Sequence, residues 1–172
     1  MSDRVLVFGA HVDDEIIGVG GIIAKLSAQG AETLVVTFTG GQQETGYARP
    51  EWKGRIAEMR RQEAEMTNTI LGIKHREFFG LPTQGVTNDR ETYQRCVKII
   101  RDFRPTMIFT HHPEDKHRDH RAVSAVTEEA WWKAAENVLA DLGRPWRAPK
   151  LYRYETTDLI SRPSHVFDIT GT

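Results

Sequence analysis

Four short runs of consecutive apolar residues alternate with segments that have the apolar spacing of helices, and this alternation limits the possible folds more than any other feature. The runs are continuous, which is typical of strands buried on both faces. Strands that alternate with helices form a parallel sheet covered by helices on both sides. We therefore expect an α/β fold, a three-layer Rossmann-like domain with a mostly parallel sheet. The predicted strands are 4–10, 33–38, 76–80 and 106–110, with a further strand at 151–156, and the predicted helices are 16–28, 55–71, 91–103 and 121–142.

Length and composition point to one domain that handles small molecules. A chain of 172 residues buries a sizeable core as a single domain. The 23 Lys and Arg against 24 Asp and Glu give a net charge of -1, so nothing indicates a nucleic-acid or membrane-surface partner. The single cysteine, Cys96, excludes a disulfide within the chain, and we expect it to be a small buried residue.

The sequence carries neither a signal-peptide pattern nor a membrane span. Charged residues at 3–4 and 13–15 interrupt the N-terminal region, where a signal peptide would need an apolar core. No apolar run approaches the ~20 residues that a transmembrane helix needs. We therefore expect a cytoplasmic protein with no membrane partner.

Two clusters of metal-binding residue types directly follow the first and fourth predicted strands. The first cluster holds His11, Asp13, Asp14 and Glu15, and the second holds His111, His112, Asp115, His117, Asp119 and His120. In an open sheet of order 3-2-1-4, the first and fourth strands are neighbours, and ligands bind in the crevice at their carboxyl ends. We therefore expect the two clusters to meet there.

These residue types suit a catalytic zinc ion. Zinc takes histidine nitrogen and carboxylate oxygen, and catalytic sites keep three protein ligands and one open position. His11 and Asp14 are three residues apart across a turn, and His117 and His120 are three apart where a helix starts, so a His, Asp, His set is available. A bound divalent ion lowers the pKa of its water toward ~7. A further carboxylate could take the proton of that water, and a further histidine could stabilise an oxyanion.

Other interpretations explain less of the sequence. Either cluster alone could be a helix cap or a set of exposed histidines, but together on adjacent strand ends they favour a site. A magnesium phosphatase would use carboxylates and few histidines. A dinucleotide site needs G-x-G-x-x-G, whereas Gly18, Gly20 and Gly21 miss that spacing. We expect these glycines to allow close packing of the helix on the sheet.

The run Ala10-His11-Val12-Asp13-Asp14-Glu15 resembles the Ala-His-Pro-Asp-Asp-Glu signature of the LmbE-like proteins, also called the PIG-L family of zinc-dependent deacetylases. The run His117-Arg118-Asp119-His120-Arg121-Ala122 resembles the family's second signature, His-x-Asp-His-x-Ala. Weaker similarity covers Arg60-x-x-Glu63 and Phe79-Gly80-Leu81-Pro82. Val12 replaces the usual proline without removing a ligand.

The resemblance implies a role for each matching residue. The residues that match the zinc ligands are His11, Asp14 and His120. Asp13 matches the general base, and His117 matches the residue that stabilises the oxyanion and protonates the leaving amine. Asp119 matches the partner that orients a neighbouring histidine, and Arg60 matches a sugar-contacting arginine. The implied enzyme is a metal-dependent amidohydrolase that removes the N-acetyl group from an N-acetylglucosamine-type sugar or sugar conjugate.

Two alternatives stay open, a metal-dependent hydrolase of another class and a metal-stabilised binding domain without catalysis. We expect residues 1–172 to form a single LmbE-like deacetylase domain that lacks the family's usual C-terminal stretch.

The loop at 40–54, with Tyr47, Arg49 and Trp52, is expected to shape the pocket. The remaining histidines at 111, 112 and 165 are expected to be structural or to support the site. The Trp131-Trp132 pair could contribute to a homo-oligomer contact.

Overall fold

The structure, a computed structural model, describes residues 2–40, 51 and 54–171. Within these residues, five parallel strands form one sheet in the order β3-β2-β1-β4-β5. The strands are β1 (Arg4–Gly9), β2 (Glu32–Thr39), β3 (His75–Leu81), β4 (Met107–His111) and β5 (Lys150–Tyr154). The predicted order of the first four strands is confirmed. Strands β1 and β4 are therefore neighbours, with Leu6 opposite Ile108.

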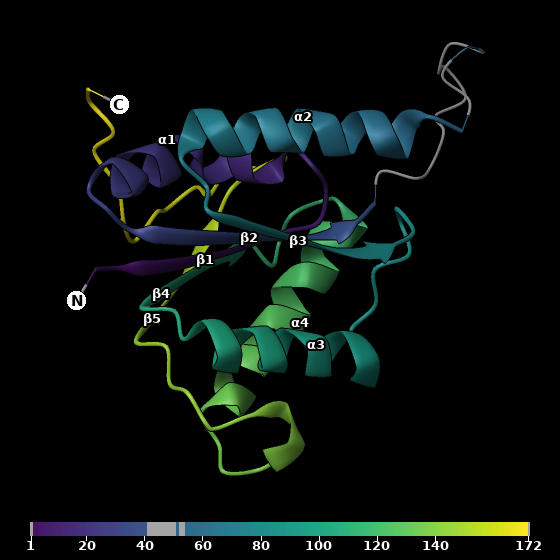
Figure 1. Cartoon of the computed structure of the whole chain (residues 1–172), viewed down its shortest axis with the longest axis vertical. Helices are drawn as coiled ribbons and strands as arrows, with labels where there is room; N and C mark the ends of the chain where they lie inside the picture. The colour runs from purple at the N-terminus through teal and green to yellow at the C-terminus, as the bar shows by residue number, and fades with distance from the viewer. Residues whose placement is uncertain (1, 41–50, 52–53, 172) are drawn as a thin grey trace.

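Helices cover both faces of the sheet. The helices are α1 (Asp14–Ala28), α2 (Ile56–Leu71), α3 (Arg90–Phe103) and α4 (Arg118–Ala134). Helices α1 and α2 lie on one face, and α3 and α4 lie on the other (Figure 1). Successive strand side chains point to opposite faces, so Val7 of β1 packs with Ile23 of α1, while Phe8 packs with the α3 side of the core. The predicted three-layer α/β domain is confirmed.

The fourth helix was predicted to end at residue 142, and this prediction is wrong. All other predicted helix and strand boundaries agree with the structure within three residues. Helix α4 ends at Ala134, and only a short 3-10 helix, Ala140–Leu142, follows it. In a continuing helix, the Ala134 carbonyl would accept a bond from the backbone four residues later. Instead it accepts one from Arg101 Nε at 3.2 Å and one from the Trp146 backbone at 2.8 Å. Tertiary contacts therefore end this helix.

The close packing of helix α1 on the sheet, expected at its three glycines, is confirmed at Gly18, whereas Gly21 packs against the segment that follows β5. A Cβ added to Gly18 would lie 2.3 Å from Cδ2 of Tyr154, and one added to Gly21 would lie 2.7 Å from Ile169. At Gly20 the nearest atom would be 3.7 Å away, which is ordinary contact. Gly18 thus lets α1 rest directly on the ring of Tyr154, and Gly20 has room for a side chain.

Substituting Gly18 by Ala is expected to destabilise the protein by about 1–3 kcal/mol, because overpacking forces the backbone or the neighbour to move. The Tyr154 ring cannot move freely, since its hydroxyl donates to the Phe8 carbonyl oxygen at 2.8 Å. Gly20→Ala, two residues along the same helix, is the control and should gain up to about 1 kcal/mol from helix propensity. Thermal melting followed by circular dichroism checks both variants. Equal melting temperatures would contradict the packing argument.

Three further expectations can be compared with the structure. Cys96 is fully buried, as expected, and burial raises the pKa of its thiol. Trp131 donates from its indole nitrogen to the Ala148 carbonyl oxygen, whereas Trp132 is exposed, and a subunit contact there stays a prediction. The loop expected to shape the pocket falls mostly on residues 41–50 and 52–53, outside the described residues. In the part of the chain that is described, no helix has both the length and the apolar character to cross a bilayer.

Candidate active site at the ends of strands β1 and β4

The two clusters of metal-binding residue types lie at the carboxyl ends of β1 and β4, as expected. Residues 10–14 turn from β1 into α1, and residues 112–117 lead from β4 into α4. His111 ends β4, and its Nε2 lies 3.0 Å from Oδ2 of Asp14, 97 residues away in the chain. Because β1 has β2 on one side and β4 on the other, the site occupies the crevice where the strand order reverses.

The turn after β1 is fixed by Asp14. Its Oδ2 accepts the backbone N–H of His11 at 2.7 Å, which closes the turn and aims both side chains to one side. Asp13 occupies the N-cap position of α1, yet its carboxylate forms no capping hydrogen bond. The Asp13 side chain is instead 42% exposed, and Oδ2 lies 3.4 Å from Nη2 of Arg60 on α2. The Asp13 carboxylate is therefore not committed to the helix and is accessible to a ligand.

Donor atoms of His11, Asp14 and His120 converge in pairs, with a different oxygen of the Asp14 carboxylate facing each histidine. His11 Nδ1 lies 3.4 Å from Asp14 Oδ2, and His120 Nε2 lies 3.3 Å from both His11 Nδ1 and Asp14 Oδ1. Tetrahedral ligands at zinc bond lengths of 2.0–2.1 Å would stand about 3.3–3.4 Å apart. The spacing of these side chains therefore fits a zinc ion. In two triplets of residues, all three donor atoms lie within 4.8 Å of one another. These triplets are His11, His117, His120 and Asp14, His111, His120, so each shares two residues with the set of His11, Asp14 and His120.

The charge of Asp14 is maintained despite its burial. Burial alone would raise its pKa, but hydrogen bonds with His11, His111 and His120 hold the pKa of Asp14 well below its usual range. Burial likewise opposes charge on His11 and His120, yet their contacts with Asp14, together with Asp119 for His11 and Asp115 for His120, outweigh it and raise both pKa values. Without metal, the carboxylate thus attracts protons to the two rings, and a bound cation would replace that positive charge.

The structure places Asp119 against His11. Oδ2 of Asp119 lies 3.1 Å from Nε2 of His11, on the opposite side of the ring from the nitrogen that faces Asp14. The same carboxylate accepts the backbone N–H groups of Gln84 at 2.6 Å and Val86 at 3.3 Å. These bonds hold the carboxylate still, so it can set the orientation and tautomer of His11.

His117 lies at the rim of the site as the N-cap of α4. Its Nδ1 accepts the backbone N–H of Asp119 at 3.2 Å, and its ring centroid lies 4.6 Å from that of His11. Burial, followed by the charges of His11 and His120, lowers the pKa of His117. A neutral ring that accepts at Nδ1 carries its proton on Nε2. His117 can therefore donate a hydrogen bond from Nε2.

Sequence reasoning missed the roles of several residues around the ligands. Asp115 Oδ2 lies 3.1 Å from His120 Nδ1, and the fully buried His111 ring stacks on His120 with centroids 4.0 Å apart. Thr156 and Thr157, just beyond β5, place their hydroxyls 3.1 Å from His111 Nδ1 and 3.3 Å from His120 Nδ1. Asp115 and His111 belong to the cluster at the end of β4, and this position in the sequence could have indicated that they support the site. The two threonines have no sequence signal.

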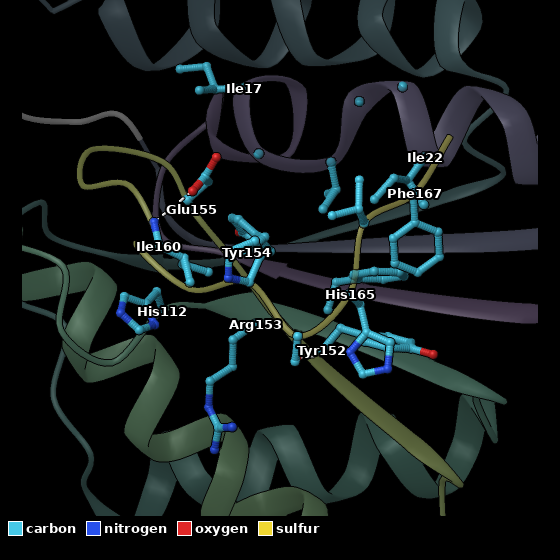
Figure 2. Close-up of a pocket in the computed structure, with 18 of the residues that line it drawn as sticks. Ile17, Ile22, His112, Tyr152, Arg153, Tyr154, Glu155, Ile160, His165 and Phe167 are labelled. Carbon is cyan, nitrogen blue, oxygen red and sulfur yellow. Dashed lines mark hydrogen bonds between the residues drawn. The ribbon is translucent and has the colours of Figure 1, made fainter. Parts of the chain in front are cut away.

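A cavity of about 750 Å³ lies next to the site, between α1, β5 and residues 160–169. Figure 2 shows its wall, with Ile17 on α1, Arg153 and Tyr154 on β5, and Phe167 on the C-terminal segment. His112 and His165, expected to be structural or supporting, also line this cavity. None of the three converging donor residues is part of the wall.

A family model and individual relatives of known name indicate the same protein family. The family model described as "PIG-L: GlcNAc-PI de-N-acetylase" matches residues 6–131. A 1D-myo-inositol 2-acetamido-2-deoxy-alpha-D-glucopyranoside deacetylase of Rhodococcus jostii is 32% identical over 88% of this chain and 61% of its own length. The protein of the same name from Rhodococcus erythropolis is 29% identical over 88% of this chain and 60% of its own length. The chain thus spans about 60% of the length of these curated relatives.

Solved structures also share the fold at more than a quarter sequence identity. The N,N'-diacetylchitobiose deacetylase of Pyrococcus horikoshii has a TM-score of 0.86 and 28% identity, and the match covers 98% of this chain and 64% of that chain. GalB, the 4-carboxy-2-hydroxymuconate hydratase of Pseudomonas putida, has a TM-score of 0.87 and 26% identity, with coverage of 98% and 73%. The matched residues include both clusters of the site, and the chain belongs to the PIG-L family.

Proposed function

We propose that this protein is a zinc-dependent amidohydrolase that removes the N-acetyl group from an N-acetylglucosamine-type sugar or sugar conjugate. The proposal rests on one observation above all. Donor atoms of His11, Asp14 and His120 lie 3.3–3.4 Å apart in pairs, which is zinc-ligand spacing. Asp13, the residue before Asp14, has a carboxylate that neither caps its helix nor takes part in these contacts. A domain that only bound metal would not need this additional carboxylate.

In this proposal His11, Asp14 and His120 hold the zinc ion, and Asp13 and His117 act on the water, the oxyanion and the leaving amine. When bound, zinc supplies a Lewis acid that polarises the acetyl carbonyl and acidifies a water molecule. Asp13 accepts the proton from the attacking water. His117 donates a hydrogen bond from Nε2 to the developing oxyanion, and the proton that Asp13 took from the water is passed on to the departing amine. The products are acetate and the free amino sugar.

Two other residues are proposed to organise the reactants. Asp119 keeps Nε2 of His11 protonated, so that Nδ1 of the same ring faces the metal. Arg60 pairs with Asp13, while its side chain is 41% exposed and keeps N–H donors free for sugar hydroxyl groups. The relatives support this substrate class, because two are named as deacetylases of an acetamido sugar linked to inositol and one as a deacetylase of diacetylchitobiose.

The first experiment is the zinc content of the purified protein beside His120→Ala. We expect about one zinc per wild-type chain and a loss in the variant, because removing one of three ligands leaves the site incomplete. His112→Ala is the matched control, since His112 lies eight positions earlier in the same cluster but contacts Glu114 and not the converging donors. Elemental analysis gives the stoichiometry. Wild-type protein that takes up no zinc would favour a binding domain without a metal centre.

Deacetylase activity is then measured as the release of primary amine. Zinc-loaded protein is incubated with N-acetylglucosamine, its inositol conjugate and diacetylchitobiose, and new primary amines are detected with a fluorogenic reagent. The likeness to GalB makes hydration of 4-carboxy-2-hydroxymuconate the second activity to assay, since one fold can serve both reactions. Turnover of that acid without any amine release would replace the deacetylase proposal.

A further inference from the structure

The two ring nitrogens of His120 have opposite surroundings. Nε2 faces the converging donors, 3.3 Å from both Asp14 Oδ1 and His11 Nδ1. Nδ1 faces away from them, 3.1 Å from Oδ2 of Asp115 and 3.3 Å from the hydroxyl oxygen of Thr157. Asp115 is 1% exposed, so it meets His120 in a buried setting. Neither the family signatures nor the comparisons give Asp115 a role.

A neutral imidazole carries one proton, and its surroundings decide which nitrogen holds it. An ionised carboxylate can only accept, so Asp115 requires the proton on Nδ1 of His120. We propose that Asp115 is a positioning residue that fixes His120 in this tautomer and leaves the lone pair of Nε2 free to bind zinc. The inference rests on the proposed function, because it concerns the same metal site.

Asp115 is itself held in place, as a positioning residue must be. Its Oδ1 accepts the backbone N–H of His117 at 2.7 Å, and its Oδ2 accepts that of Thr157 at 3.2 Å. With a backbone N–H group at each oxygen, Asp115 is surrounded by hydrogen-bond donors, and such surroundings favour the ionised form of a carboxylate. The same carboxylate therefore connects His120 with the backbone of His117, the residue proposed to meet the oxyanion.

The arrangement repeats the one at His11. There, Asp119 contacts the ring nitrogen that faces away from the metal and is held by two backbone N–H groups. Each of the two histidines proposed to bind zinc thus has its own buried carboxylate. Such outer carboxylates raise the basicity of a histidine ligand and fix its ring.

The test is Asp115→Asn, which keeps the size of the side chain and an oxygen at the Oδ1 position to accept the backbone N–H of His117. The amide can turn its NH₂ toward His120 Nδ1 and favour the wrong tautomer. We expect zinc affinity, measured by competition with a chelator, to fall about 10–100-fold. The visible spectrum of the cobalt-substituted variant should also change, because His120 would exert a different ligand field on the cobalt ion. In steady-state kinetics, kcat should fall more than KM rises.

Asp158→Asn is the matched control. Asp158 serves the same loop, since its Oδ2 accepts the backbone N–H of Lys116 at 2.6 Å, and the substitution removes the same charge. The hydrogen bond and the ion pair of Asp158 both go to Lys116 and not to a histidine, so zinc affinity and the cobalt spectrum should match the wild type. If Asp115→Asn also matches the wild type in both measurements, Asp115 is only a loop residue and the inference is wrong.

A measurement on the wild type decides the matter even if Asp115→Asn does not fold. In protein labelled with ¹⁵N at histidine, nitrogen shifts show which ring nitrogen of His120 carries the proton. We expect Nδ1–H in the zinc-loaded protein, and also in metal-free protein at a pH where the ring is neutral. A proton on Nε2 in metal-free protein overturns the inference. Absence of zinc binding by the wild type would overturn the proposed function, and the metal-free spectrum would still test Asp115.

Discussion

Asp13→Asn is expected to lower kcat by about 10²–10⁴-fold, the range for loss of a general base, and to leave the zinc content unchanged. Asparagine has nearly the same shape but cannot take a proton from water. The wild-type carboxylate forms no capping hydrogen bond with α1, so the substitution should not weaken the helix. Steady-state amine release and elemental analysis on the same preparation measure the two quantities together.

The control for Asp13 must separate its own chemistry from its contact with Arg60. Arg60 pairs with Asp13 at 3.4 Å and with Glu63 at 2.8 Å. Glu63→Gln removes the other carboxylate from the same guanidinium without touching the donor residues, and it should keep kcat close to that of the wild type. An equal loss in both variants would mean that the effect passes through Arg60. Full turnover by Asp13→Asn would refute the role of Asp13 as the base.

The largest expected loss of stability comes from Arg101→Met. Arg101 is 2% exposed, and its guanidinium donates hydrogen bonds to six backbone carbonyl oxygens. They reach Lys133 at 3.4 Å, Ala134 at 3.2 Å, Glu136 at 2.8 Å, Val138 at 2.9 Å, Leu139 at 2.7 Å and Gly143 at 3.1 Å. The guanidinium thus organises the end of α4 and the segment that follows it.

Methionine fills similar space but satisfies none of these carbonyl groups. Because each buried polar group left without a partner costs about 1–3 kcal/mol, we expect unfolding free energy to fall by at least ~3 kcal/mol. At roughly 2–4 °C per kcal/mol for a chain of this size, the melting temperature should fall by about 6–12 °C. Lys98→Met is the control on the same helix, where the lost group is an exposed amine paired with Asp102 and should contribute less than about 1 kcal/mol. Similar melting temperatures for the two variants would show that Arg101 is not the organiser of this segment.

Only some residues of the site could be predicted from the sequence, and there is a physical reason why the others could not. His11, Asp14, His117 and His120 stand at fixed spacings beside strand ends, so a local pattern exposes them. Asp115 lies in the same cluster, but its role depends on which ring nitrogen of His120 it meets, and spacing does not contain that information. Thr156 and Thr157 enter the site only because β5 pairs with β4.

By itself, the sequence determined the layered α/β fold, the strand order and the meeting of the two clusters, because continuous apolar runs and strand-helix alternation are local properties that limit the topology. Tertiary structure alone decided where α4 ends, because the cation of Arg101, 33 residues earlier, takes the carbonyl oxygen that a longer helix would use. It also decided that Asp13 turns to Arg60 instead of capping its own helix. Contacts between residues distant in the chain require the whole fold, and for that reason they leave no periodic trace in the sequence.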